Sequence, residues 1–110
     1  MRRDSLAIAV EGELDIARIE ELDRLVAPAL AGEGVDVIID IGKVTFLDST
    51  GLGWLLRTQD NLKRCKGSLR VVSAGQAVLP RLLSLTGLQD QINLYANLAD
   101  AERDIHPRAM

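Results

Sequence analysis

The chain of 110 residues is 47% hydrophobic and 26% charged, which is typical of one globular domain with its own core and excludes a disordered chain. Its 13 basic and 16 acidic side chains give a net charge of −3, and its basic cluster, residues 63–66, is short, so we expect no nucleic-acid partner. The lone cysteine, Cys65, excludes an intrachain disulfide. Because the chain lacks an apolar signal segment and any run long enough to cross a bilayer, we expect a cytoplasmic protein with no direct membrane insertion.

The first part of the chain predicts a strand, a helix and a second strand. Apolar residues alternate with alanines over residues 6–10, which indicates a strand. Asp15 is placed to cap the helix that follows, and Pro28 should kink that helix or end it early, because proline removes an internal hydrogen bond. The helix carries one apolar stripe: Ile16, Ile19, Leu22, Val26 and Leu30. After a glycine-rich turn, residues 35–41 predict a second, mostly apolar strand.

The second part of the chain repeats this alternation. The predicted helices and strands cover residues 49–64, 69–73, 78–86, 91–95 and 98–105, in the order helix, strand, helix, strand, helix. Gly87 is placed as the C-cap of the middle helix, and Asn97 can cap the last one, which should end at His106-Pro107.

Four alternations of strand and helix predict an α/β domain with a largely parallel sheet and helices mainly on one face. Ligands of such sheets bind beyond the carboxyl ends of the strands. The segments expected at this edge are residues 12–15, 44–52 and 73–76.

The most informative segment is Asp48-Ser49-Thr50-Gly51-Leu52-Gly53, which joins the second strand to the next helix. Its hydroxyls lie at a helix N-terminus, where free backbone N–H groups and the helix dipole favour an acceptor oxygen, a phosphate or an anionic partner group. A simple helix cap would explain the serine. Two glycines cost up to about 1 kcal/mol each within a helical turn, so we expect Gly51 and Gly53 to leave the hydroxyls open to another protein.

Catalytic, metal and nucleotide chemistry have weak support. A serine nucleophile needs a histidine base, and the one histidine, His106, lies near the C-terminus, so we expect no catalytic residues and no enzyme. One histidine and one cysteine do not suggest a metal site. Gly51-Leu52-Gly53 lacks the third glycine of a dinucleotide fingerprint, since Leu56 stands in its place. We therefore expect no cofactor.

Three further residues allow two interpretations each. Cys65, late in its helix, fits a packing residue better than a redox sensor. Trp54 should be partly buried against a neighbouring helix rather than exposed beside the motif. Asp40 and Asp48 leave open a receiver-like domain phosphorylated on aspartate, although such a site needs clustered carboxylates around a divalent ion. An acid-stable phosphate would indicate serine and an acid-labile one aspartate.

Five segments together resemble the STAS-domain family of anti-sigma-factor antagonists. In order, they are residues 12–15 (GELD), 37–41 (VIIDI), 44–53 (VTFLDSTGLG), 69–72 (LRVV) and 85–88 (LTGL), and they span nearly the whole chain. The resemblance implies a single STAS domain over residues 1–110. It also implies a four- to five-stranded, mostly parallel or mixed sheet with about four helices mainly on one face.

In that family the first serine of the Asp-Ser-Ser/Thr-Gly motif accepts a phosphate, which implies phosphorylation at Ser49, with Thr50 as the neighbouring hydroxyl. The implied partner-binding residues are Asp15, Asp48, Ser49, Thr50, Gly51 and Leu52. Family members often carry an additional strand before the segment GELD. This chain has only a few residues there, so we expect a different sheet edge or dimer contact.

The resemblance implies a partner switch. The unphosphorylated antagonist binds an anti-sigma factor, usually a GHKL-type serine kinase, and so releases the sigma factor; phosphorylation frees the antagonist, and a serine phosphatase resets it. The protein would then be a monomer or weak homodimer. Two alternatives remain: a STAS scaffold of a stress-sensing complex, and an accessory subunit of a transporter. The intact motif favours the antagonist over the transporter subunit but does not separate it from the scaffold, whose very large particles gel filtration would detect.

Overall fold

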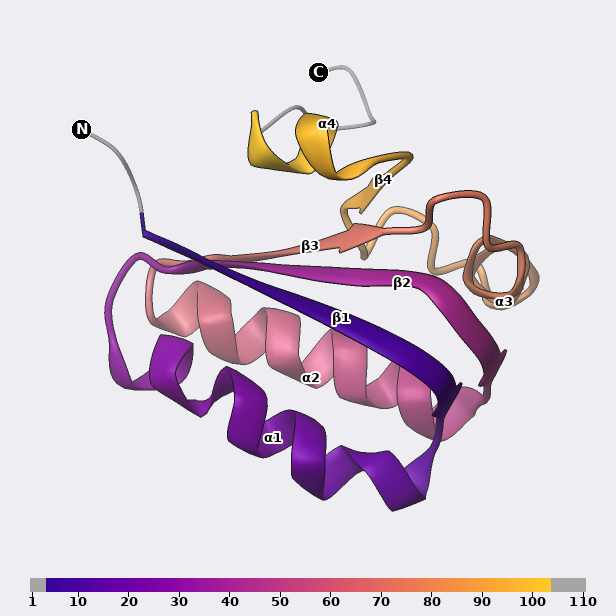
Figure 1. The fold of residues 1–110 in the computed structure, drawn as a ribbon, viewed down its shortest axis with the longest axis horizontal. Helices are drawn as coiled ribbons and strands as arrows, with labels where there is room; N and C mark the ends of the chain where they lie inside the picture. The colour runs from indigo at the N-terminus through magenta and orange to yellow at the C-terminus, as the bar shows by residue number, and fades with distance from the viewer. Residues whose placement is uncertain (1–3, 104–110) are drawn as a thin grey trace.

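A four-stranded parallel sheet organises the computed structural model, which describes residues 4–103 (Figure 1). The strands lie side by side in sequence order, β1-β2-β3-β4. They are β1 (Ser5–Leu14), β2 (Asp36–Leu47), β3 (Ser68–Val72) and β4 (Leu94–Tyr95). Each strand is followed by a helix, which confirms the predicted α/β fold.

The helices are α1 (Ile16–Ala31), α2 (Ser49–Arg64), α3 (Val78–Thr86) and α4 (Leu98–Glu102). Figure 1 shows α1 and α2 side by side beneath the sheet, and the short α4 on the opposite face. Leu79 and Leu83 of α3 belong to the same core as α1 and α2. The helices thus lie mainly on one face, as predicted.

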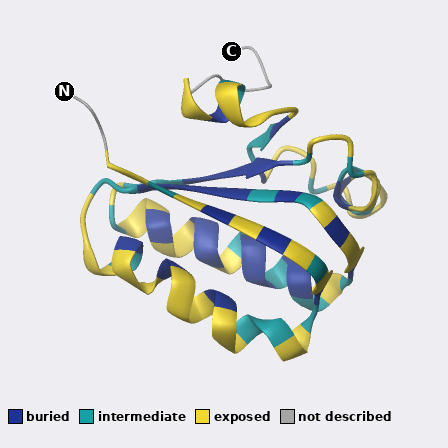
Figure 2. Ribbon diagram, in the orientation of Figure 1, coloured by how far each residue is buried: buried dark blue, intermediate teal, exposed yellow. Residues whose placement is uncertain are grey.

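The main core fills the space between the sheet and helices α1, α2 and α3. The helix faces that point toward the sheet are buried and the opposite faces are exposed (Figure 2). Its largest fully buried side chain is Trp54 of α2. A second, smaller cluster lies under α4 on the other face of the sheet: Ile38, Val72, Tyr95 and Ala101.

Strands β1 and β2 are longer than the sequence pattern predicts. The predicted strands ended at residues 10 and 41, whereas β1 continues to Leu14 and β2 to Leu47. The parallel register shifts between Ala9 and Glu11 and again between Gly12 and Glu13. These irregularities interrupt the alternation of apolar residues, so periodicity alone missed the extensions. The fourth strand is shorter than the predicted 91–95, since it spans two residues.

Pro28 does not end α1 early, so that part of the prediction was wrong. The helix continues through Pro28 to Ala31. The proline leaves the Arg24 carbonyl without its usual donor. Both residues are exposed, so water can solvate that carbonyl and the helix tolerates the proline.

The last helix is described to Glu102, and the predicted end at Ile105, His106 and Pro107 lies outside the described residues. Within residues 4–103, none of the helices has the length and apolar character needed to span a membrane.

Candidate functional site at the carboxyl edge of the sheet

Asp15 and Asp48 occupy equivalent places in two adjacent strand–helix units. They follow Leu14 and Leu47, which are register partners at the ends of β1 and β2. Each aspartate has an extended backbone and caps the helix after it, accepting a hydrogen bond at Oδ1 from the amide two residues on. The first turns of α1 and α2 therefore meet at one edge of the sheet, where the arrowheads of β1 and β2 end in Figure 1.

Asp48 already uses the amides at the start of α2. Its Oδ1 accepts from the N–H groups of Thr50 at 3.0 Å and Gly51 at 3.1 Å, and its backbone carbonyl accepts from Leu52 at 3.0 Å. This N-terminus was expected to offer free amides to a phosphate or partner anion. The structure narrows that expectation, because the carboxylate of Asp48 already accepts from two of these amides, those of Thr50 and Gly51.

Ser49 is the first residue of α2 and is exposed. Among the described residues, no side-chain or backbone group forms a hydrogen bond with its hydroxyl. Thr50 is partly buried, and Leu52 points into the core with 5% of its surface exposed. Of the motif's two hydroxyls, that of Ser49 is thus the more open to another protein.

The two glycines of the motif have different structural roles. Gly51 is buried, and a Cβ there would overlap the backbone carbonyl of Leu14. A Cβ on Gly53 would meet only Arg57 Nη1, at an ordinary contact distance of 3.5 Å. Close packing of α2 against β1 therefore requires glycine at position 51, whereas at position 53 the glycine keeps the surface bare.

Two exposed apolar side chains flank this edge. Ile16, at the start of α1, is 78% exposed, and Phe46, next to the end of β2, is 46% exposed. The sequence pattern placed Ile16 in the apolar stripe of its helix, but in the structure this first residue of α1 is exposed. Phe46 was quoted in the motif but given no role. Its exposure results from the register shift opposite Glu13, which no residue pattern signals.

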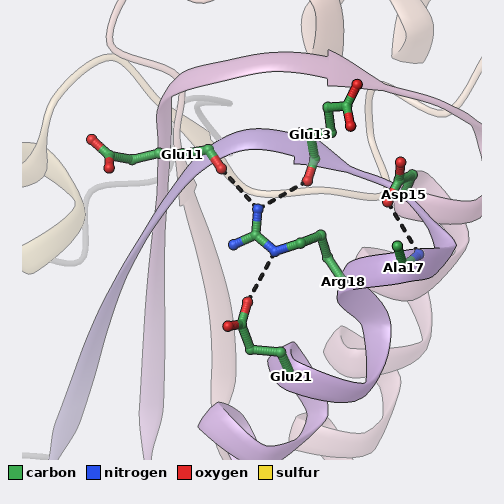
Figure 3. Close-up of polar contacts among 6 residues, drawn as sticks. All are labelled: Glu11, Glu13, Asp15, Ala17, Arg18 and Glu21. Carbon is green, nitrogen blue, oxygen red and sulfur yellow. Dashed lines mark hydrogen bonds and ion pairs between the residues drawn. The ribbon is translucent and has the colours of Figure 1, made fainter.

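Arg18 ties the start of α1 to the free edge of β1 (Figure 3). Its Nη1 donates to the carbonyls of Glu11 at 2.8 Å and Glu13 at 3.2 Å, and its Nε donates to Glu21 Oε1 at 2.9 Å. β1 has no neighbouring strand on this side within the described part of the chain. Arg18 therefore satisfies edge carbonyls that would otherwise invite strand pairing, and it fixes α1 beside the site.

Trp54 packs against the neighbouring helix, as expected, but is completely rather than partly buried. It is 1% exposed, and its Nε1 donates to Asp23 Oδ1 of α1 at 2.7 Å.

Cys65 is partly buried with its Sγ 3.5 Å from the Leu30 carbonyl, an arrangement typical of a packing residue.

Asp40 lies apart from Asp48, in the middle of β2. Its Oδ1 accepts from the Gly42 amide at 2.8 Å, and it lines a shallow pocket of about 170 Å³ with Ala9, Val10, Glu11 and Lys43. Over residues 4–103 no group of three or more histidine, cysteine or acidic residues is placed to hold a metal ion. The aspartate-phosphorylation alternative gains no support from this arrangement, since it requires such a carboxylate cluster.

The third predicted edge segment, residues 73–76, packs against β2, where Gln76 Nε2 donates to the Val44 carbonyl at 3.3 Å.

Comparison with known proteins gives consistent matches over nearly the whole chain. The model of the family described as STAS domain matches residues 2–101. The anti-sigma-B factor antagonist of Bacillus subtilis is 32% identical over 93 residues, which cover 84% of each chain. The crystal structure of an anti-sigma factor antagonist from Mycobacterium paratuberculosis has a TM-score of 0.75 at 32% identity and covers 94% of this chain and 90% of its own. The structure of the antagonist SpoIIAA in its unphosphorylated form shares the fold, with a TM-score of 0.67 at 20% identity over 94% of this chain and 90% of its own.

Proposed function

The chain belongs to the STAS domain family, and from this premise we propose that it is an anti-sigma factor antagonist controlled by phosphorylation at Ser49. In this proposal the unphosphorylated protein binds an anti-sigma factor that is a GHKL-type serine kinase, and the sigma factor is released. The kinase phosphorylates Ser49 and so releases the protein, and a serine phosphatase removes the phosphate and restores the binding form. The chain is thus a substrate rather than an enzyme, and it acts in the cytoplasm without a nucleic-acid partner.

The observation that carries this proposal is the placement of Ser49. The residue is exposed at the first position of α2, and its hydroxyl has no hydrogen-bond partner among residues 4–103. Partner kinases need an accessible hydroxyl on a rigid support, and the cap formed by Asp48 with Thr50 and Gly51 supplies that support. The names of the relatives, anti-sigma-B factor antagonist, identify the kind of partner to expect.

We place the partner surface around Ser49, between the two helix starts. Ile16 directly follows Asp15, Phe46 lies two residues before Asp48, and both side chains are exposed. Exposed apolar side chains beside polar ones are typical of protein interfaces. Thr50 lies beside Ser49 at this surface. Gly51 and Leu52 are buried, so they support the surface from beneath by holding α2 against the sheet.

The switch is electrostatic in this proposal. A phosphoryl group adds about −1.5 to −2 charges at neutral pH, directly beside the carboxylate of Asp48. The added anion must lose its hydration inside the interface and is repelled by acidic groups there, so the partner dissociates. The cap of α2 does not involve the Ser49 side chain, so the fold should survive the modification.

The proposal can be tested with the full chain. Unphosphorylated protein is used to retain partners from the native cell extract, and the retained proteins are identified by mass spectrometry. We expect a GHKL-type kinase, which is then purified and incubated with ATP, magnesium and wild-type protein, Ser49→Ala or Thr50→Ala. Phosphopeptide mapping should place an acid-stable phosphate on Ser49 in the wild type and in Thr50→Ala. A Ser49→Ala variant that is still fully modified would contradict the proposal.

A further inference from the structure

Ser49, Gly53 and Arg57 form a stripe along one face of α2, because residues four apart in a helix lie one above the other. A Cβ on Gly53 would lie 3.5 Å from Nη1 of Arg57. The guanidinium of Arg57 therefore reaches back along the helix, over the bare surface of Gly53 and toward the turn that carries Ser49. Any other residue at position 53 would put a side chain between them.

Arg57 is exposed on the surface of α2. Among residues 4–103 it makes no hydrogen bond or ion pair with another side chain or backbone group. Asp60, three residues further along α2 and also exposed, is close enough in sequence to pair with it, yet no ion pair joins the two. The guanidinium is thus available to a new anion.

A phosphate on Ser49 would need such a cation. The amides of Thr50, Gly51 and Leu52 already donate to Asp48, so a phosphate cannot use them without displacing that carboxylate. The same carboxylate adds like-charge repulsion. Of the first amides of α2, only that of Ser49 itself is not donated to Asp48, so a side-chain cation would add the missing charge compensation. Arg57 already spans the first of the two turns that separate it from Ser49.

We propose that Arg57 binds the phosphate of phosphorylated Ser49 across Gly53. This inference rests on the proposed modification of Ser49. The remaining helical turn rises about 5.4 Å, which a phosphoserine side chain and one charge-assisted hydrogen bond of about 2.8 Å can bridge. The planar guanidinium can donate two parallel N–H groups to phosphate oxygens. The phosphate would then lie over Gly53 and cover the surface that the glycine leaves bare.

The test uses full-length protein with phosphoserine incorporated at position 49 during synthesis, so that it does not depend on any kinase. The midpoint of the phosphate's second ionisation, ordinarily about 6, is measured by ³¹P NMR as a function of pH in low salt. Wild type is compared with Arg57→Gln and with Gly53→Leu, which keeps the arginine but blocks its path. Arg64→Gln is the matched control, because it removes the same charge from α2 about 10 Å further along the axis.

A nearby cation favours the dianion, so we expect the wild-type midpoint to lie about half a unit to one unit below that of Arg57→Gln. Gly53→Leu should resemble Arg57→Gln, Arg64→Gln should resemble wild type, and the difference should shrink in high salt. Equal midpoints in wild type and Arg57→Gln would overturn the proposal, as would an equal shift in Arg64→Gln. If Gly53→Leu fails to fold, the comparison of wild type with Arg57→Gln and Arg64→Gln still tests whether Arg57 binds the phosphate. A failure here leaves the mapping of kinase modification to Ser49 unaffected, so the two proposals fail separately.

Discussion

Asp36 of β2 and Arg70 of β3 form an ion pair in the interior, on the face of the sheet covered by α4. Arg70 Nη2 lies 3.0 Å from Asp36 Oδ2, and the two side chains are only 6% and 5% exposed. Ser68 Oγ donates to the other carboxylate oxygen at 2.7 Å, and Arg70 Nη1 donates to the carbonyl of Ala101 in α4 at 2.7 Å. One guanidinium thus links two strands to the last described helix.

Removing one member of this pair should be costly. Arg70→Met removes the guanidinium that lies beside the buried Asp36 carboxylate, and we expect a loss of about 3–5 kcal/mol in the free energy of unfolding. Replacing both residues, with Asp36→Leu and Arg70→Met, should cost less than Arg70→Met alone, because the buried carboxylate is removed together with the guanidinium. Urea denaturation measures all three proteins. A double variant less stable than Arg70→Met would contradict this account of the pair.

The two glycines at the start of α2 should respond oppositely to alanine. Gly51→Ala forces a Cβ against the backbone carbonyl of Leu14, which no side-chain rotation relieves, so we expect a loss of about 1–3 kcal/mol. Gly53→Ala meets only the flexible end of Arg57 and removes a helix-interior glycine, so it should gain up to about 1 kcal/mol. Thermal unfolding of the matched pair measures the difference. Equal destabilisation by both substitutions would refute the distinction.

The aspartate caps should contribute similarly to stability. Asp48→Ala and Asp15→Ala each remove a side-chain acceptor at a helix start, and each should cost about 1 kcal/mol, or about 4 °C in melting temperature. Asp48→Asn keeps an acceptor oxygen and should recover most of the loss. Calorimetry of the three variants checks this. If Asp48→Asn were as unstable as Asp48→Ala, the carboxylate charge rather than the cap would be the dominant contribution.

Mimicking the phosphate should weaken partner binding without unfolding the protein. Ser49→Asp adds a charge beside Asp48, and we expect the fully phosphorylated protein to lose about 4 kcal/mol of binding free energy, roughly a thousandfold in affinity. Ser49→Asp should be much weaker than wild type while melting within a few degrees of it. Ser49→Ala should still bind after incubation with kinase and ATP. Calorimetric titration against the purified anti-sigma factor tests this, and tight binding by Ser49→Asp would rule out the electrostatic switch.

The local pattern of the chain was enough to predict the succession of strands and helices and the position of the motif. The cap of α2 was expected at the serine of the motif, but Asp48 forms it and Ser49 is the first helical residue. Strand–helix alternation, the caps at Asp15 and Asn97, and the C-cap at Gly87 depend on residues near one another in sequence. Such signals act within a few residues, so they can be recognised without the tertiary structure. The phosphoacceptor role of Ser49 came from the family resemblance and stays a prediction.

Contacts between distant segments determined everything else about the site. The register of β1 on β2 extended both strands and brought Asp15 beside Asp48. Gly51 was interpreted as an opening for a partner, yet the packing of α2 on Leu14 requires it. The occupation of the first amides by Asp48 became clear only in three dimensions, as did the placement of Arg57 over Gly53. A residue pattern records which side chains are apolar or polar, but hydrogen-bond partners and steric limits depend on distances that only the folded chain defines.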